Sequence, residues 1–519
     1  MSIFSLSHFT LSDGTELDLA PGSVLCVVGG NNVGKSLFLR EITGHLQRHL
    51  WPQRQIVNEL SFAMGLNDET SGPWLRVNGI QQTTAGQEEV FTPVNGGSGT
   101  SVTNFMGTVA NIQQIGLGQL MNFFVRVLDS HQRAELAITN MQVGSGALYL
   151  VYRDGSLEQK LSNLCKSVFG FPLTLDRSNG TVMLRVGKPI VPVPSLQHPT
   201  KEYADDVLSL RPLAEQGDGV RNYMSMALHM LTASEPVTII DEPEAFLHPA
   251  QARVLGGYLG KEVKARELQL ITATHDRDFV LGLLGSGALV TFFRLNRVGD
   301  ATTATVLPAA EVNKLWSRPV LRYSNILQGL FHKAVAVCEA DADCRWYAAV
   351  LDSVMEDSSR SSEEALFVPS GGKDQIPSSV AALRRLGVPA FAMLDFDSLL
   401  DQDFMEKMLK TFDVADEQLL KTLKSINSQL STSEQHKAAK SSGLNGLPLG
   451  DVTRMATELL ESLKGHNILV VPVGELESFD RRIGGHAAIW VTQALKRNLH
   501  KTNGAAREYV TPLATAITV

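Results

Sequence analysis

The feature that most constrains this chain is the stretch GGNNVGKS at residues 29–36, which fits the phosphate-binding pattern G-x-x-x-x-G-K-[ST]. The apolar run Val24–Val28 before it predicts a short buried strand, and Leu37–Ile42 after it predicts the start of a helix. A strand, a glycine-rich loop and a helix in this order point backbone N–H groups and a helix N-terminus at a phosphate. The sequence therefore predicts an α/β fold built around a nucleotide site.

Each position of this loop has an expected role. Gly29 and Gly34 allow the tight turn, Lys35 reaches the β- and γ-phosphates of ATP, and the Ser36 hydroxyl sits on Mg²⁺. The expected nucleotide-binding residues are Gly29, Asn31, Asn32, Gly34, Lys35 and Ser36. A chance glycine turn is the alternative interpretation, and the flanking strand and helix disfavour it.

The composition bounds the class of protein. A chain of 519 residues predicts two or more domains, and 44% hydrophobic and 19% charged residues are ordinary for a soluble globular protein. A net charge of −8 gives no global electrostatic argument for nucleic acid, but it does not exclude a local basic track. The four scattered cysteines lack the spacing of a zinc site, and there is neither a signal peptide nor a run of 18 apolar residues. We therefore expect a cytoplasmic protein without a membrane span.

Two further apolar runs end in polar side chains. The run PVTIIDEP at 236–243 predicts a strand ending in Asp241, which could hold the water shell of Mg²⁺, and Glu242, which could polarise the attacking water. The run LQLITATHD at 268–276 predicts a strand ending in His275, where a histidine could contact the γ-phosphate. The alternatives are a strand running into an ordinary acidic turn and a structural histidine.

The motifs DEPEAFLHP and ITATHD resemble those of ABC-type ATPases, in particular their SMC/RecF-like and OLD-like branch. This resemblance implies that Asp241 is the Walker B metal ligand, Glu242 the catalytic glutamate and His275 the switch histidine. It also implies a signature loop that acts on the nucleotide of another subunit, and hence a homodimer or higher homo-oligomer.

The candidate signature loop is QGDGVR at 216–221, with Gly217 and Gly219 as nucleotide-binding residues and a helix expected over Asn222–Leu231. It lacks the serine of the common LSGGQ form, but a glycine loop that opens a helix still offers N–H groups to a phosphate.

Residues 51–210 are less informative. We expect loops or hairpins over 72–107, a helix over 120–137, and strands at 147–152 and 181–186. Gln113 or Gln114 is a guess for the Q-loop. Long heptad repeats are missing, which excludes a long coiled-coil arm.

After about residue 325 the strand–helix pattern starts again. Apolar runs end in Glu339, in the pair Asp395 and Asp397, and in Glu475 and Glu477. Alternating strands and helices predict a parallel sheet, whose strands bring their carboxyl ends to one edge. Oxygen-only ligands suit Mg²⁺ or Mn²⁺, so these carboxylates are candidate metal ligands. The alternative is that each is an ordinary acidic turn residue.

A glutamate strand followed by D-x-D resembles a TOPRIM domain. Together with the ATPase it is similar to the OLD family of ATP-dependent nucleases, which includes the nuclease subunit of Gabija-type antiphage systems. The resemblance implies catalytic roles for Glu339, Asp395 and Asp397, and it adds Asp343 as a metal ligand. It also calls for a late lysine, matched by Lys496, although that lysine could equally lie on a solvated helix face. The chain has Ala340 where the family has glycine.

The predicted fold class is α/β: an ABC/OLD-type P-loop ATPase over 1–320, then a TOPRIM-like, Rossmann-like parallel sheet over 325–519 with a helical insertion at about 401–462. The predicted function is an ATP-gated, divalent-metal-dependent DNA endonuclease in antiphage defence, with a partner defence protein as a further candidate. The alternative is an ATPase sensor or scaffold that holds a partner effector, with a non-catalytic TOPRIM fold.

Overall fold

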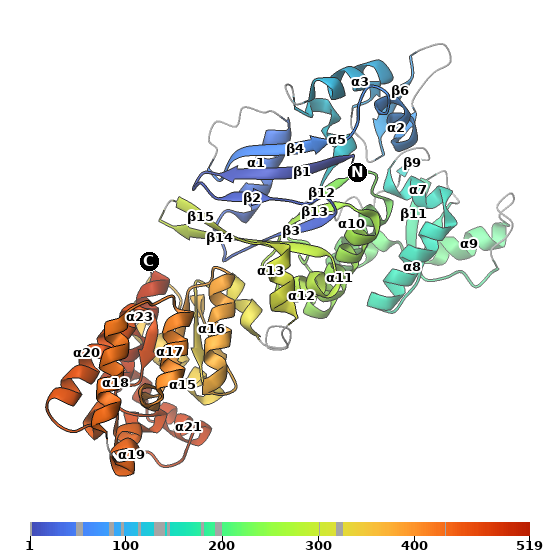
Figure 1. Cartoon of the computed structure of the whole chain (residues 1–519). Coiled ribbons are helices and arrows are strands. Elements are labelled where there is room, and N and C mark those ends of the chain that lie inside the picture. Colours follow the sequence, from blue (N-terminus) through green and yellow to red (C-terminus); the bar gives the residue numbers. More distant parts are fainter. Residues whose placement is uncertain are drawn as a thin grey trace. The chain divides into compact units, whose positions relative to one another are not determined.

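A computed structural model describes residues 3–47, 55–81, 88–94, 98–112, 116–128, 141–142, 146–177, 181–192, 200–299, 301–317, 325–430 and 432–518. The chain forms two compact units, Met1–Asn313 and Lys314–Val519. Figure 1 shows helices and strands in both of them. Gln113 and Gln114 lie outside the described residues.

A six-stranded sheet of order β15-β14-β3-β13-β12-β8 forms the centre of the N-terminal unit. Its strands are β3 (Ser23–Val28), β8 (Val125–Leu128), β12 (Val237–Asp241), β13 (Gln269–Ala273), β14 (Leu289–Val298) and β15 (Ala301–Leu307). All neighbours pair in parallel except β14 and β15. Every residue of β3 is buried, as expected of a parallel strand covered on both faces.

Alternate residues of these strands pack on opposite faces of the sheet. Leu25, Val27 and Ile239 join a core with helix α1 (Lys35–Gln47) and a small antiparallel sheet, β2-β1-β4. The strands of that small sheet are β1 (Phe4–Leu11), β2 (Glu16–Asp18) and β4 (Val57–Met64). Helices α10 (Asp218–Thr232), α11 (Pro249–Arg266) and α12 (Arg277–Gly285) cover the other face (Figure 1).

Several predictions between residues 51 and 210 are wrong. Of the helix predicted over 120–137, Met121–Phe124 is helical as α5, but Val125–Leu128 is the edge strand β8, because this segment pairs in parallel with β12. Residues 129–137 lie outside the described part of the chain. Ala147–Arg153 is helix α7 rather than a strand, and its buried residues Ala147, Leu148 and Val151 lie at helical spacing. The segment 72–107 contains β5 (Gly79–Gln81), β6 (Val90–Pro93) and β7 (Thr100–Ser101), but also most of α2 (Ser71–Asn78) and the start of α3 (Val102–Ala110). The strand predicted at 181–186 is confirmed as β11 (Thr181–Val186).

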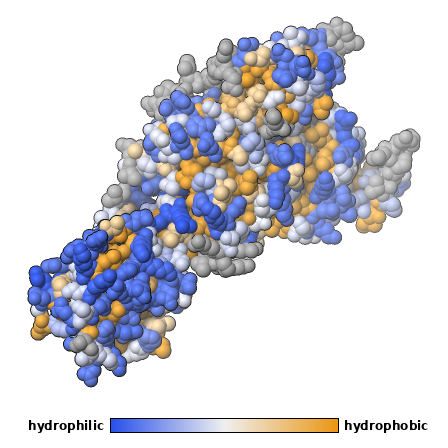
Figure 2. All heavy atoms as spheres, in the orientation of Figure 1, coloured by the Kyte–Doolittle hydropathy of each residue, from blue (hydrophilic) through white to orange (hydrophobic). Residues whose placement is uncertain are grey.

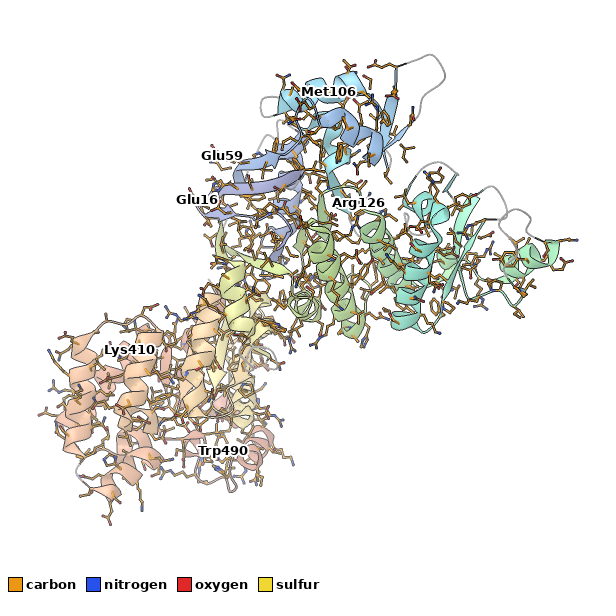
Figure 3. The ribbon with its side chains drawn as sticks, turned by 45° about the vertical axis from the view of Figure 1, so that its right-hand side comes forward. Glu16, Glu59, Met106, Arg126, Lys410 and Trp490 are labelled. Carbon is orange, nitrogen blue, oxygen red and sulfur yellow. The ribbon has the colours of Figure 1, made fainter. Side chains whose placement is uncertain are left out.

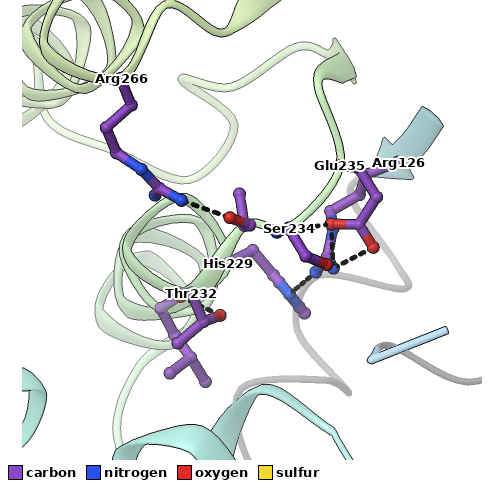
Figure 4. A network of polar contacts seen from close by, with 8 residues as sticks. Arg126, His229, Thr232, Ser234, Glu235 and Arg266 are labelled. Atoms are coloured by element: carbon purple, nitrogen blue, oxygen red, sulfur yellow. Dashed lines mark hydrogen bonds and ion pairs between the residues drawn. The ribbon is translucent and has the colours of Figure 1, made fainter. Parts of the chain in front are cut away.

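A buried ion pair ties β8 to the turn before β12 (Figure 4). Arg126 donates from Nη2 to both carboxylate oxygens of Glu235 at 2.8 Å, and it also contacts Nδ1 of His229 on α10. Burial, together with the Arg126 charge, lowers the pKa of His229 well below its usual value, which favours the neutral ring. Removing one member of such a buried pair costs roughly 3–5 kcal/mol, so this network holds the end of α10 against the start of β12.

The C-terminal unit contains a four-stranded, fully parallel sheet of order β17-β16-β18-β19. Its strands are β16 (Ala334–Cys338), β17 (Ala365–Pro369), β18 (Ala390–Leu394) and β19 (Ile468–Val470). Helices α15 (Asp341–Val354), α21 (Ala488–Lys496) and α23 (Gly504–Thr518) pack on one face of this sheet. There the rings of Trp346 and Trp490 meet edge to face at 5.1 Å. Figure 3 labels Trp490. On the side drawn in Figure 2, hydrophilic side chains cover most of this unit.

Helices fill the segment between β18 and β19. They are η6 (Phe396–Leu400), α17 (Gln402–Thr411), α18 (Glu417–Gln429), α19 (Ser433–Ser442), η7 (Gly443–Gly446) and α20 (Asp451–Gly465). Helix α16 (Ile376–Arg385) packs against β16 and β18, and α20 packs against β19. The insertion therefore builds the second helical layer of the unit as well as adding to its surface.

Candidate functional site

The glycine-rich loop connects β3 to α1 with the backbone that a phosphate cradle requires. Gly29, Asn32 and Gly34 have φ values of +142°, +60° and +100°, and an added Cβ at Gly29 would lie 2.4 Å from the Leu295 carbonyl oxygen. Lys35 Nζ donates to the carbonyl oxygens of Gly29 at 3.0 Å and Gly30 at 2.7 Å. Asn31 and Asn32 are exposed, and Ser36 is half-buried in the first turn of α1.

Three neighbouring parallel strands bring the loop, Asp241, Glu242 and His275 to one edge of the sheet, since β13 lies between β3 and β12. Nδ1 of His275 lies 3.6 Å from Oε1 of Glu242. Burial lowers the pKa of Lys35, while the negative charges of Glu242, Glu244 and Asp241 oppose that shift. The lysine and the acidic strand end are thus close enough to interact electrostatically.

The donor chemistry at this edge suits Mg²⁺. The Ser36 hydroxyl begins α1 and the Asp241 carboxylate ends β12, and hard oxygen donors of this kind are those that Mg²⁺ takes. Lys35 is a buried cation in the first turn of α1, and the Glu242 carboxylate is half-exposed, so a water molecule can reach it.

The candidate signature loop opens α10, a helix of 15 residues with Gly217 as its N-cap. An added Cβ at Gly219 would lie 2.5 Å from the carbonyl oxygen of Phe246, so the helix start packs directly on the loop after β12. Asn222 Nδ2 reinforces this contact by donating to the Ala245 carbonyl oxygen at 2.6 Å. The signature segment and the Walker B segment therefore form one packed structure.

The C-terminal unit gathers a second group of acidic residues, which we name the carboxylate cluster: Glu339, Asp343, Asp395, Asp397 and Glu475. Glu339, Asp395 and Glu475 follow the adjacent strands β16, β18 and β19. Burial, together with the charges of the other four members, raises the pKa of Asp395 from 3.8 to about 8. Burial also raises the pKa of Asp343 to about 6, with Glu339 and Glu477 adding to the effect.

Some candidate ligands have structural roles. Asp343 Oδ2 accepts the Ala340 N–H at 2.9 Å and so caps α15. Glu477 accepts the Ala487 N–H at 2.6 Å and pairs with His486 at 2.6 Å, which ties it to the turn before α21. Asp397 lies in the 3-10 helix η6, and Asp395 is the N-cap residue of that helix, so the two carboxylates do not follow one another along an extended strand.

The cation that pairs with the carboxylate cluster is Lys440, at 3.1 Å from Asp397, whereas the expected Lys496 is exposed near the end of α21. Lys440 lies in α19, in the insertion, and sequence reasoning missed it because nothing in its neighbourhood distinguishes it from other surface lysines. Its position is fixed by the next residue, Ser441, whose carbonyl oxygen accepts hydrogen bonds from Ser478 and Arg481.

The cluster suits a hard cation in chemistry, because all its donors are oxygen and their mutual repulsion is what a cation would relieve. Among the residues that the structure describes, however, no group of three or more His, Cys, Asp or Glu side chains stands close enough to hold an ion. An ion bound here would draw these side chains together.

No helix in the described part of the chain is long and apolar enough to cross a membrane.

Comparisons with known proteins agree with the geometry of the N-terminal unit. Residues 190–282 match the AAA_21 family, described as "AAA domain, putative AbiEii toxin, Type IV TA system". The matched range contains the signature candidate, Asp241, Glu242 and His275. A search among curated proteins finds no match.

Solved structures that match this chain at low sequence identity include SMC head domains and a component of an ABC transporter complex. The SMC head domain from Thermotoga maritima is 13% identical with a TM-score of 0.30, over 59% of this chain and 97% of that one. The Smc head bound to the C-terminal domain of ScpA, derived from Pyrococcus furiosus, is 11% identical with a TM-score of 0.34, over 61% and 98%. CbiO1 from Clostridium perfringens, part of the ABC transporter complex CbiONQ, is 13% identical with a TM-score of 0.30, over 61% and 96%.

The glycine-rich loop after β3, the acidic end of β12 and the match of residues 190–282 to an AAA-domain family together support a P-loop ATPase fold for the N-terminal unit.

Proposed function

We propose that this protein is an ATP-gated nuclease that cuts DNA at the carboxylate cluster, and that it acts in antiphage defence as a relative of the OLD family. The N-terminal unit hydrolyses ATP. The C-terminal unit, with a TOPRIM-like sheet, supplies the phosphodiester-cleaving site.

In the ATPase half, each role follows from position. Lys35 and the N–H groups at the start of α1 would bind the phosphates of ATP, and Asp241 and Ser36 would hold Mg²⁺. Glu242 would orient the attacking water. Nδ1 of His275 lies 3.6 Å from Oε1 of Glu242. Gly217 and Gly219 open α10, whose N-terminus is suited to the phosphates of a nucleotide on a second copy of the chain. We therefore propose a homodimer that forms on ATP.

The nuclease half rests mainly on one observation: Asp395 is buried beside four other carboxylates, and burial together with their charges raises its pKa to about 8. Such a cluster is costly to maintain, and clusters of this kind are typical of sites that take a divalent cation. Glu339, Asp395, Asp397 and Glu475 would hold Mg²⁺ or Mn²⁺, whose chemistry is to activate water and stabilise the leaving oxygen.

The test is a plasmid cleavage assay with Mg²⁺ or Mn²⁺, with and without ATP. We expect Asp395→Ala, Asp397→Ala and Glu339→Ala to abolish cleavage while ATP turnover stays near the wild-type rate. Asp357→Ala, which changes an exposed aspartate of the same unit, is the matched control and should cut normally. Loss of ATP turnover with cleavage retained would contradict the division of labour between the two units.

A second candidate function is an ATPase sensor or scaffold that holds a partner effector. Two observations favour it. Nζ of Lys440 lies 3.1 Å from the Asp397 carboxylate and so offsets its charge. Among the described residues, no three acidic, histidine or cysteine side chains are close enough together to hold a metal ion. If the wild-type protein cuts neither DNA nor RNA with any divalent metal, with or without ATP, this second function is the better explanation.

A further inference from the structure

A buried glutamate that none of the roles above uses lies beside His275. Glu244 follows Glu242 by two residues, in the turn after β12, and its side chain is only 5% exposed. Its Oε1 accepts the backbone N–H of His275 at 3.0 Å and lies 3.4 Å from Nδ1 of the same residue. One carboxylate oxygen therefore holds both the main chain and the ring of His275.

The ring of His275 is held along one edge. Its Nδ1 faces Oε1 of Glu244 at 3.4 Å and Oε1 of Glu242 at 3.6 Å, and the side chain is 49% exposed. Both of these contacts of the ring with the glutamates are made by Nδ1. A histidine held in this way presents one ring nitrogen in a fixed direction.

The backbone of the turn supports this arrangement. Glu242 has a φ of +48°, which is unusual for a residue other than glycine, and its N–H donates to the Ala273 carbonyl oxygen at 2.9 Å. The N–H of Leu247 donates to the Glu244 carbonyl oxygen at 2.9 Å. These bonds fasten the turn onto the end of β13 and direct the Glu244 side chain inward, beneath His275.

Burial raises the pKa of Glu244, while its hydrogen bonds and the charge of His275 oppose that shift. A carboxylate is costly to bury without such partners, so the bond to His275 is part of what holds Glu244 in place.

We propose that Glu244 is a positioning residue for ATP hydrolysis, which fixes the ring of His275 relative to Glu242 and so sets the catalytic rate. Glu244 touches neither nucleotide nor water in this role; it acts through His275. The proposal rests on the ATPase activity of the N-terminal unit and is independent of any nuclease activity. It predicts that changes at Glu244 alter kcat for ATP and leave ATP affinity unchanged.

Two substitutions separate positioning from support of the fold. Glu244→Gln keeps the length of the side chain and an oxygen that can accept the His275 N–H. Glu244→Asp keeps the charge but withdraws the carboxylate by one methylene. If Glu244 positions His275, Glu244→Asp should lower kcat for ATP by about tenfold or more, and Glu244→Gln should lower it by less than about threefold. In both variants the Kd for ATP should stay within about twofold of the wild-type value.

A double-mutant cycle tests whether Glu244 acts through His275. Single-turnover ATP hydrolysis by the full-length protein, with enzyme in excess, measures slow variants. Once His275→Ala has removed the ring, Glu244→Asp should cause no further loss. The matched control is Glu158→Asp, which shortens another glutamate of this unit that accepts a backbone N–H, that of Leu175 at 3.0 Å. It should leave the rate unchanged in both backgrounds.

Three results would overturn the proposal. Glu244→Asp could slow the His275→Ala variant by the same factor as the wild type, which would show an effect that does not pass through the ring. It could leave kcat unchanged, which would remove any role in hydrolysis. It could weaken ATP binding as much as it lowers kcat, which would indicate general damage to the site.

Discussion

Replacing Asp395 by asparagine should stabilise the C-terminal unit, and increasingly so as the pH rises. Asp395 follows β18 in the centre of the sheet, and burial plus the charges of Asp343, Asp397, Glu339 and Glu475 raise its pKa from 3.8 to about 8. Asparagine has nearly the same shape and carries no charge. The substitution therefore removes the repulsion and leaves the packing almost intact.

The sign and size follow from proton binding. The folded pKa lies above the unfolded value, so between pH 4 and pH 8 the folded state holds a proton that the unfolded state has lost. The stabilisation is fully present below about pH 4 and is lost as the pH rises through about 8. The slope is about −1.4 kcal/mol per pH unit, and the whole effect is about 6 kcal/mol, an upper value because neighbouring carboxylates share protons.

The assay is hydrogen exchange of the peptides that cover β16 and β18, measured with a chelator present from pH 5 to pH 9. Across this pH range, the free energy of opening that hydrogen exchange reports should fall in the wild type relative to Asp395→Asn, by about 2 kcal/mol or more. Asp357→Asn, at an exposed turn, is the control and should follow the wild type. Equal pH slopes for wild type and Asp395→Asn would refute the conclusion that these carboxylates repel one another in the folded protein.

Three predictions concern the ATPase. Lys35→Ala should weaken ATP binding by about 100-fold, because the lysine is the cation of the phosphate loop; equilibrium binding of a fluorescent ATP analogue measures this. Glu242→Gln should keep ATP binding, stop hydrolysis and trap a dimer with ATP, as seen by light scattering; turnover at the wild-type rate would exclude this residue as the catalytic base. Gly219→Val should lower kcat for ATP with little change in ATP affinity, since even a Cβ there would lie 2.5 Å from the Phe246 carbonyl oxygen; a normal kcat would contradict the packing of α10 on that loop.

Where local sequence carries the structural information, the sequence predicted the structure well. The strands β3, β12 and β13 are short apolar runs, and each ends at a residue with its own chemistry. A buried parallel strand requires such a run, and a tight turn requires the glycines of the phosphate loop, so both leave a readable pattern. The same logic located β16, β18 and β19 of the C-terminal sheet.

The predictions from sequence were wrong or incomplete where contacts between residues far apart in the chain determine the structure. Val125–Leu128 becomes a strand because β12 offers it an edge, and Arg126 is buried there only because Glu235, 109 residues later, neutralises it. An isolated window cannot contain that partner. Glu244 was overlooked for the same reason: its role depends on His275, which is 31 residues away in the sequence and adjacent in space.

Lys440, which pairs with Asp397 of the carboxylate cluster, shows that the fold and not the local sequence decides which lysine lies at this site. It also gives a final prediction. Lys440 and Lys496 both lie on exposed helix turns, but the bonds that Ser441 receives from Ser478 and Arg481 bring only Lys440 to Asp397, at 3.1 Å. An ammonium there repels a second cation, so Lys440→Ala should raise Mn²⁺ affinity by about threefold to tenfold; the effect is modest because the lysine is half-exposed. Lys496→Ala is the matched control and should leave Mn²⁺ affinity unchanged in titration calorimetry. Weaker Mn²⁺ binding in Lys440→Ala would mean that the lysine supports the cluster instead of competing with the ion.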